Sequence, residues 1–298
     1  MDVPISHIRH QGRVIASLGL TVVDSIKNST IGRSQPALPG KTFESEIPPR
    51  DPGLVDDLIK FSGGNPETYK NHLPAYFFPQ WSVPLLAKTI KYLPYNLTKI
   101  MNAGCKITIN EPLKLSLPLK NQARLESVDE NKSRVLIKQS LIIGHEKAPE
   151  SVVVEQSTII LKNAKSGGKK KPLLIPVDAT EIGRANLAKK SGLNFALLTG
   201  DFNPLHWVTP YAKAFGYSSP ILHGFATMSL AIEQLNKNVF GGDPSLLKEI
   251  DVKFSRPLRL PAKIAFFTKD DTVYVGYGAG SKPFLVGTFK ASSNSTIH

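Results

Sequence analysis

The sequence contains a single cysteine, Cys105, among its 298 residues. One thiol excludes an intrachain disulfide, and no Cys/His cluster at zinc-ligand spacing accompanies it, which argues against a structural zinc site. Cys105 lies in CKITI, a predicted strand, so we expect a small buried core residue. The seven histidines form no HExxH-like pair on one helical face, and we therefore predict no catalytic metal.

Long apolar runs are also missing. The longest run near the start, VIASLGLTVV at 14–23, falls well short of the roughly 20 residues that a membrane-spanning helix needs. Basic residues precede it, but the DSIKNST that follows has no small-residue cleavage pattern. We therefore expect neither a secretory signal nor a transmembrane segment, and we predict a cytoplasmic protein.

Acidic residues are scarce: 24 Asp and Glu stand against 37 Lys and Arg, which gives a formal net charge of +13. Such a field attracts nucleic acid, an anionic membrane or a polyanionic small molecule. The basic residues are spread along the chain without a zinc-finger, RNP-like or leucine-zipper pattern, so we expect no nucleic-acid partner. The one true cluster, KSGGKKKP at 165–172, is typical of a solvated linker.

The second half of the sequence reads as a loop, a helix and four strands. Apolar residues recur at three- and four-residue intervals from about 222, which predicts one buried face of a helix; they are Phe225, Met228, Ile232, Leu235 and Val239. Glycines at 241 and 242 end this pattern. Short runs rich in β-branched and aromatic residues then predict strands at 250–255, 262–268, 272–278 and 284–291.

The first half repeats this order. SGGNP at 62–66 precedes a predicted helix at 81–90 and strands near 105–109, 122–127, 134–143 and 152–161. ITINEPLKL at 107–115 matches VKFSRPLRL at 252–260, and SGGNP matches TGDFNP with one residue deleted. The two matches indicate a duplicated unit whose copies pack side by side. The predicted organisation is an extension at 1–38, a first copy at 39–163, a basic linker at 164–173, a second copy at 174–292 and a tail at 293–298.

The copies differ at the residues best suited to chemistry. TGDFNPLH at 199–206 contains Asp201 and His206, whereas the first copy has Gly64 opposite Asp201 and no histidine at the matching step. We also place Gln80 opposite Gly224. If the loop is catalytic, only the second copy is active, and the first copy serves as scaffold and pocket wall.

Composition alone explains the loop as a tight turn, because Gly, Asp, Asn and Pro favour such geometry. A carboxylate and an imidazole five positions apart can in addition hold and polarise one water between them. Asn203 and Pro204 would set their spacing. Further on, His223 and Gly224 begin the predicted helix, where a free N–H suits an anion or oxyanion, although an ordinary helix start with a satisfied polar residue is the more common explanation of this pair.

The stretch LLTGDFNPLHWVTPYAKAFGYSSPILHGFATMS resembles the hydratase motif of MaoC-like dehydratases, the (R)-specific 2-enoyl-CoA hydratase family. LPAYFFPQWSVPLLA is similar to the degenerate first half of the two-domain members, so the resemblance spans about 40–291. Many relatives have Asp-Pro where Val208 and Thr209 stand here, with Pro210 one position later. The resemblance implies an α+β double hot-dog fold, in which each copy wraps a long helix in an antiparallel sheet.

The resemblance also implies a hydro-lyase of fatty-acid metabolism, which hydrates trans-2-enoyl thioesters and dehydrates 3-hydroxyacyl thioesters without a cofactor. In this reading Asp201 and His206 hold the water, Asn203 orients the loop, Gly224 donates to the thioester carbonyl and His223 shapes the helix mouth. The substrate partner is acyl-CoA or an acyl carrier protein, whose phosphates suit the basic surface; the candidate contacts are Lys169, Lys170 and Lys171.

Two other functions fit the same sequence. Hot-dog proteins also include acyl-CoA thioesterases, and a non-catalytic acyl-CoA-binding protein would keep the loop only as a turn. A homodimer and a monomer both stay open as the oligomeric state.

Overall fold

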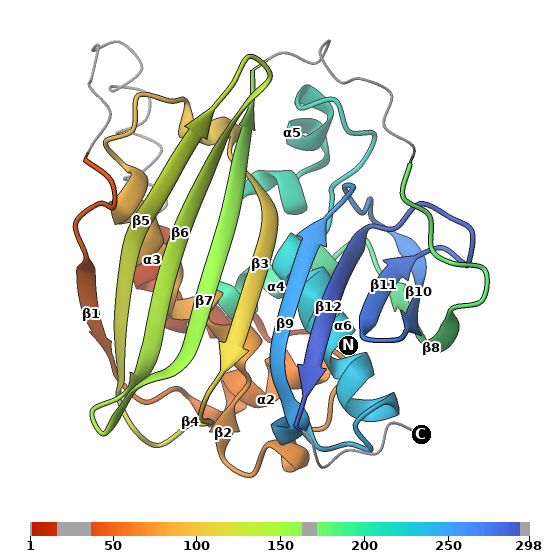
Figure 1. Cartoon of the computed structure of the whole chain (residues 1–298), viewed down its shortest axis with the longest axis horizontal. Helices are drawn as coiled ribbons and strands as arrows, with labels where there is room; N and C mark the ends of the chain where they lie inside the picture. The colour runs from red at the N-terminus through yellow and green to blue at the C-terminus, as the bar shows by residue number, and fades with distance from the viewer. Residues whose placement is uncertain (1, 17–36, 163–171, 293–298) are drawn as a thin grey trace.

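The computed structural model describes residues 2–16, 37–162 and 172–292. It forms one large antiparallel sheet with the helices packed behind it (Figure 1). None of the helices in these residues is both long and apolar enough to cross a membrane. The predicted tail at 293–298 and nearly all of the predicted linker lie outside the described residues.

The sheet has ten strands in the order β1-β5-β6-β7-β3-β9-β12-β11-β10-β8. Five come from the first half of the chain: β1 (Phe43–Ile47), β3 (Met101–Ile109), β5 (Leu119–Glu130), β6 (Arg134–His145) and β7 (Ala148–Leu161). Five come from the second: β8 (Thr180–Leu187), β9 (Leu247–Phe254), β10 (Ala262–Lys269), β11 (Thr272–Gly276) and β12 (Leu285–Ala291). The strand order therefore repeats about the junction between β3 and β9, as a duplication requires.

The two halves share one core across that junction. β3 and β9 pair antiparallel with Ile107 opposite Ile250, and both side chains are fully buried. A single cluster of buried apolar side chains contains residues from both halves. The pairing leaves neither copy with an open edge at the centre of the sheet. Cys105 is buried beside this junction, which confirms it as a core residue, and burial raises the pKa of its thiol.

The helices lie on one face of the sheet (Figure 1). The α-helices are α2 (Pro52–Phe61), α3 (Pro79–Ile90), α4 (Ser191–Thr199), α5 (Thr209–Ala214) and α6 (Gly224–Asn238). The short 3-10 turns are η1 (Ile5–His10), η2 (Pro66–Tyr69), η3 (Ala75–Phe77), η4 (Leu97–Lys99), η5 (Pro204–His206) and η6 (Pro244–Leu246), and β2 (His72–Leu73) pairs with β4 (Leu113–Lys114). The predicted apolar stripe of α6 is buried from Phe225 to Leu235.

All eight predicted strands and both predicted long helices are present. The strands that the sequence did not indicate, β1 and β8, are the two outer strands of the sheet. Each has one neighbouring strand, and every residue except the buried last one is exposed or partly buried, so neither has the apolar run that identifies the inner strands. α2 and α4, which precede the two matching loops, were not predicted either.

Equivalent backbone hydrogen bonds align the two loops more closely than the sequence does. The N–H of Leu115 donates to the carbonyl of Asn71 at 2.9 Å, and the N–H of Leu260 donates to the carbonyl of Pro220 at 2.8 Å. Leu115 and Leu260 are the last residues of the two matching nine-residue segments. Residues 71–75 therefore correspond to residues 220–224.

This alignment corrects the predicted counterpart of Gly224, which is Ala75 and not Gln80. The prediction placed Gln80, near the start of α3, opposite Gly224 at the start of α6. In the first copy, however, the 3-10 turn η3 comes before α3, so the residue equivalent to Gly224 lies five positions earlier, in η3. Gln80 is buried within α3, and its side-chain amide donates to the Oε1 of Gln11 at 3.2 Å.

Candidate active site

The loop that contains Asp201 is held by its own side chains. α4 ends at Gly200, which adopts the left-handed conformation that favours glycine. The Oδ1 of Asn203 accepts from the N–H of Leu205 at 3.1 Å, and the Oδ1 of Asp201 accepts from the N–H of Asn203 at 3.3 Å. Donor atoms of Asp201 and His206 lie within 4.8 Å of each other across this loop. The role of Asn203 in orienting the loop stays a prediction.

The ring orientation of His206 is set by a backbone carbonyl. Its Nδ1 lies 2.8 Å from the carbonyl oxygen of Ile221, so Nδ1 has the proton and donates. In the neutral ring, Nε2 then keeps its lone pair. His206 is partly buried, and its Nε2 is available as a proton acceptor.

His223 ties the loop to the start of α6. Its Nε2–H donates to the backbone carbonyl of Asp201 at 3.0 Å. Its ring stacks on that of His206 with centroids 3.6 Å apart, and Phe195 lies 4.9 Å away. Its Nδ1 is buried and has no hydrogen-bond partner within the described part of the chain. His223 therefore does more than shape the helix mouth, because it holds both members of the predicted pair.

Burial keeps both histidines neutral. Desolvation, followed by the neighbouring His206, lowers the pKa of His223 to about 3, and the opposing effect of Asp201 is smaller. Desolvation also lowers the pKa of His206, against an opposing contribution from Asp201. At neutral pH, two uncharged imidazoles thus lie beside one carboxyl group.

Gly224 is the first residue of α6. The first N–H groups of a helix have no partner inside it, and the helix dipole makes this end favourable for negative charge. A Cβ on Gly224 would lie 3.1 Å from the ring of Phe254 in β9. The small residue therefore lets the helix start lie close against the strand, directly after His223 in the sequence.

The same residues could be considered as metal ligands. Donor atoms of Asp201, His206 and His223 all lie within 4.8 Å of one another. His206 Nδ1 and His223 Nε2 each donate to a backbone carbonyl, however, so each ring has only one nitrogen left that could bind a metal ion. The predicted phosphate contacts, Lys169, Lys170 and Lys171, lie outside the described residues.

One supporting element had no signal in the sequence. Gln11, in the N-terminal extension, is fully buried, and its side-chain amide donates to the carbonyls of Leu197 and Leu198 at 2.9 and 3.1 Å. These carbonyls belong to the last turn of α4, directly before the Asp201 loop. The contact joins residues more than 180 positions apart, and no local pattern could have revealed it.

Comparison with known proteins shows which proteins the chain is similar to. The family model described as "MaoC like domain" matches residues 172–272. The chain is 25% identical over 184 residues to the peroxisomal enoyl-CoA hydratase 2 of Arabidopsis thaliana; the match covers 54% of this chain and 56% of that protein. It is also 25% identical to 3-hydroxyacyl-thioester dehydratase X of Mycobacterium tuberculosis, over 78% of this chain and 81% of the relative.

Solved structures show the same architecture. The crystal structure of HtdX from Mycobacterium tuberculosis superimposes with a TM-score of 0.69, at 18% identity, and the match covers 85% of this chain and all of that one. Another neighbour at a TM-score of 0.56, also from Mycobacterium tuberculosis, is described as having a double hot-dog fold. The predicted fold class is therefore confirmed. The chain has a double hot-dog fold, and its residues 172–272 match the family model of the MaoC-like domain.

Proposed function

We propose that this protein hydrates trans-2-enoyl thioesters to (R)-3-hydroxyacyl thioesters and catalyses the reverse dehydration. One observation supports this most directly: donor atoms of Asp201, of a neutral His206 and of His223, the residue before the first N–H of α6, all lie within 4.8 Å of one another. Relatives with matching sequence have hydratase and dehydratase names. Because the match covers only 56% of the Arabidopsis protein's length, the activity of the whole chain is a proposal.

In the proposed reaction a water lies between the Asp201 carboxylate and His206 Nε2. The oxygen of this water adds to C3 while the thioester carbonyl becomes an enolate. His206 Nε2 has the lone pair that can accept the water's proton, and the pair returns one proton to C2, so protons balance. General acid–base catalysis of this kind contributes roughly two to four powers of ten in rate.

The Gly224 N–H would stabilise the negative charge that develops on the carbonyl oxygen. A preorganised donor at such a position is worth on the order of 3 kcal/mol of barrier. His223 would act as a positioning residue, because it holds the Asp201 carbonyl and the His206 ring at once. We propose no resident cofactor, since these groups complete the proton transfers by themselves.

The substrate carrier would be coenzyme A or an acyl carrier protein. Arg256 is exposed two residues after Phe254, whose ring lies against Gly224. We propose that it contacts carrier phosphates, together with Lys169, Lys170 and Lys171. We also propose a cytoplasmic location, which a fluorescent fusion would test. We further propose a homodimer, which the molar mass in solution would test.

The deciding experiment follows a conjugated 2-enoyl-CoA by absorbance and free thiol by a thiol reagent. We expect the absorbance to fall without thiol release and the product to be the (R)-3-hydroxyacyl thioester by chiral analysis. Release of thiol would instead identify the thioesterase alternative. Binding without either change would identify the acyl-CoA-binding protein.

A further inference from the structure

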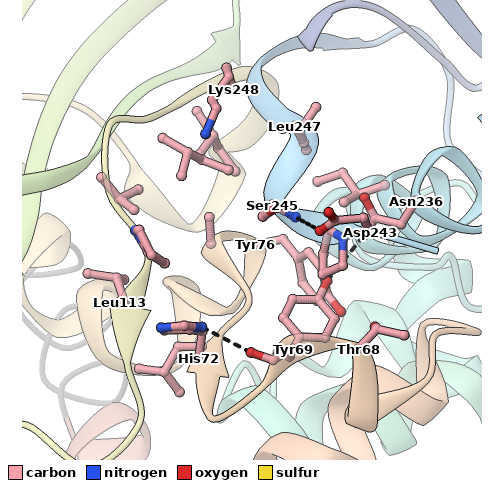
Figure 2. Close-up of a pocket in the computed structure, with 18 of the residues that line it drawn as sticks. Thr68, Tyr69, His72, Tyr76, Leu113, Asn236, Asp243, Ser245, Leu247 and Lys248 are labelled. Atoms are coloured by element: carbon pink, nitrogen blue, oxygen red, sulfur yellow. Dashed lines mark hydrogen bonds between the residues drawn. The ribbon is translucent and has the colours of Figure 1, made fainter. Parts of the chain in front are cut away.

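The first copy contains a cavity at the position that matches the active site. It encloses about 180 Å³ between the loop from Thr68 to Tyr76, the end of β3, the last turns of α6 and the start of β9 (Figure 2). Asn65 and Asn203 each accept from the N–H two residues later, and Thr68 and His206 each lie three residues after these asparagines. Thr68 therefore corresponds to His206.

The counterpart of Gly224, Ala75, also lines this cavity. The cavity contacts α6 at Ile232 and Asn236, whereas the candidate active site lies at Gly224. Twelve residues of helix span about 18 Å, so the two sites lie at opposite ends of α6.

A carboxyl group from the other copy fills the space of the missing aspartate. A Cβ on Gly64, the counterpart of Asp201, would lie 2.1 Å from a carboxyl oxygen of Glu233 in α6. The hydroxyl of Tyr76 donates to Glu233 at 2.6 Å, and that of Tyr69 donates to the same oxygen. Burial raises the pKa of Glu233. The cavity thus lies beside a loop whose counterparts of Asp201 and His206 are Gly64 and Thr68.

Three polar side chains that line the cavity use a donor group within the protein. His72 donates through Nδ1 to the carbonyl of Tyr69 at 3.1 Å, which leaves its Nε2 lone pair free in the neutral ring. Asn236 donates through Nδ2 to the Tyr69 hydroxyl at 3.2 Å, and its buried Oδ1 has no partner among the described residues. The Thr68 hydroxyl donates to the carbonyl of Asn65 at 2.8 Å. A ligand that binds at Asn236 Oδ1 must therefore supply the donor.

The charge of the cavity rim disfavours an anionic ligand. Glu111 lines the cavity at the position where the second copy has Arg256. Asp243 is also at the rim, close to Lys70 and Lys248. Two acidic groups thus balance the two lysines, and the rim has no excess positive charge for a phosphate.

The interior is apolar and small; Ile107, Ile232, Leu247 and Ile250 are buried side chains that line it. An apolar cavity of about 150 Å³ holds a benzene molecule, so a ligand of about six to eight heavy atoms fits. We propose that this cavity is a second, non-catalytic binding site for a small uncharged alcohol, whose hydroxyl donates to Asn236 Oδ1 while its hydrocarbon body fills the apolar slot. This site does not depend on the proposed hydratase activity.

A matched pair of probes tests the proposal on the full chain. Cyclohexanol and cyclohexanone have the same size, but only the alcohol can donate a hydrogen bond. By calorimetry or ligand-detected NMR, we expect a Kd on the order of 1 mM for cyclohexanol. Cyclohexanone should bind about tenfold more weakly, because a buried acceptor would stay unpaired. Absence of cyclohexanol binding, or equal affinity for both probes, would overturn the proposal.

Variants locate the site. Asn236→Leu should abolish the preference for the alcohol. Thr68 is half-buried at the rim, and Thr68→Trp should fill the cavity and abolish binding of both probes. The circular dichroism spectrum of Thr68→Trp and its rate of 2-enoyl-CoA hydration should equal those of the wild type. His206→Ala should bind cyclohexanol as the wild type does. A folded Thr68→Trp protein that still binds the alcohol would contradict the assignment, as would loss of binding in His206→Ala.

Discussion

The two copies build the same loop and fill it differently. Both loops begin with an asparagine that caps a 3-10 turn, and both accept the same backbone hydrogen bond from the Pro-Leu-x-Leu segment that follows a central strand. They differ in every residue that the proposed chemistry uses; the pairs are Asp201 and Gly64, His206 and Thr68, His223 and Pro74, and Gly224 and Ala75. The asparagine cap and this backbone hydrogen bond therefore maintain the conformation of the loop, independently of the catalytic side chains.

The largest expected effect concerns the carboxylate and the imidazole themselves. Asp201→Asn removes the charge at constant shape and His206→Ala removes the proton acceptor, so each should lower kcat/KM for hydration of a short 2-enoyl-CoA by about two powers of ten or more. Thr68→Ala, the matched change in the first copy, should leave kcat/KM unchanged.

The double variant of Asp201 and His206 should be barely slower than either single variant, because groups that act on one water fail as a unit. Circular dichroism serves as the folding control. A near-wild-type rate in either single variant would show that the two copies do not differ in the way proposed here.

The second effect is on stability. Gly64→Asp would restore the aspartate of the second copy, but its Cβ would overlap the Glu233 carboxyl group at 2.1 Å. We expect the free energy of unfolding to fall by about 3 kcal/mol, through overpacking and the burial of a second carboxylate. Denaturant unfolding measures this, and Glu233→Ala in the same background should recover part of the loss. An unchanged midpoint in Gly64→Asp would mean that this space is not filled as described.

The third effect is the pH dependence of stability. The pKa of His223 falls from 6.5 to about 3 on folding, so the unfolded chain binds the proton first as the pH falls. The contribution of neutral His223 to the free energy of unfolding is therefore complete above pH 6.5. Below pH 6.5 this contribution is lost progressively, at about 1.4 kcal/mol per pH unit. His223→Gln, whose amide can still donate, should remove that part of the slope in denaturant unfolding between pH 6.5 and 5. Identical slopes in variant and wild type would refute the assignment.

The smallest effect concerns charge at the two matching strand ends. Arg256→Ser should raise KM for acyl-CoA about threefold at low salt and weaken the salt dependence of KM, because exposed attractions are modest and screened over about 8 Å at physiological ionic strength. Glu111→Ser, its counterpart at the cavity of the first copy, should change neither. Steady-state kinetics across a salt series checks both, and equal behaviour of the two variants would remove Arg256 from the binding surface.

Much of the fold could be predicted from the sequence because its signals are local. Strands with apolar alternation, the stripe of α6 and the two matching Pro-Leu-x-Leu segments each occupy fewer than twenty consecutive residues. The loop from Asp201 to His206 is equally local, since its turn depends on its own Asn and Pro. The similar distances between the matching segments of the two halves also predicted a duplicated unit.

What only the tertiary structure decided depends on residues that are distant in sequence. The stacking of His206 on His223, the pKa of about 3 for His223 and the carboxyl group of Glu233 at Gly64 all arise where separate segments meet. The same is true of Gln11 on α4 and of the alignment that replaces Gln80 with Ala75. By itself the sequence determined which local conformations and which chemical groups are available, because caps, turns and apolar periodicity act within a few residues. The tertiary structure decided which groups share a desolvated space, because burial and proximity depend on the packing of the whole chain.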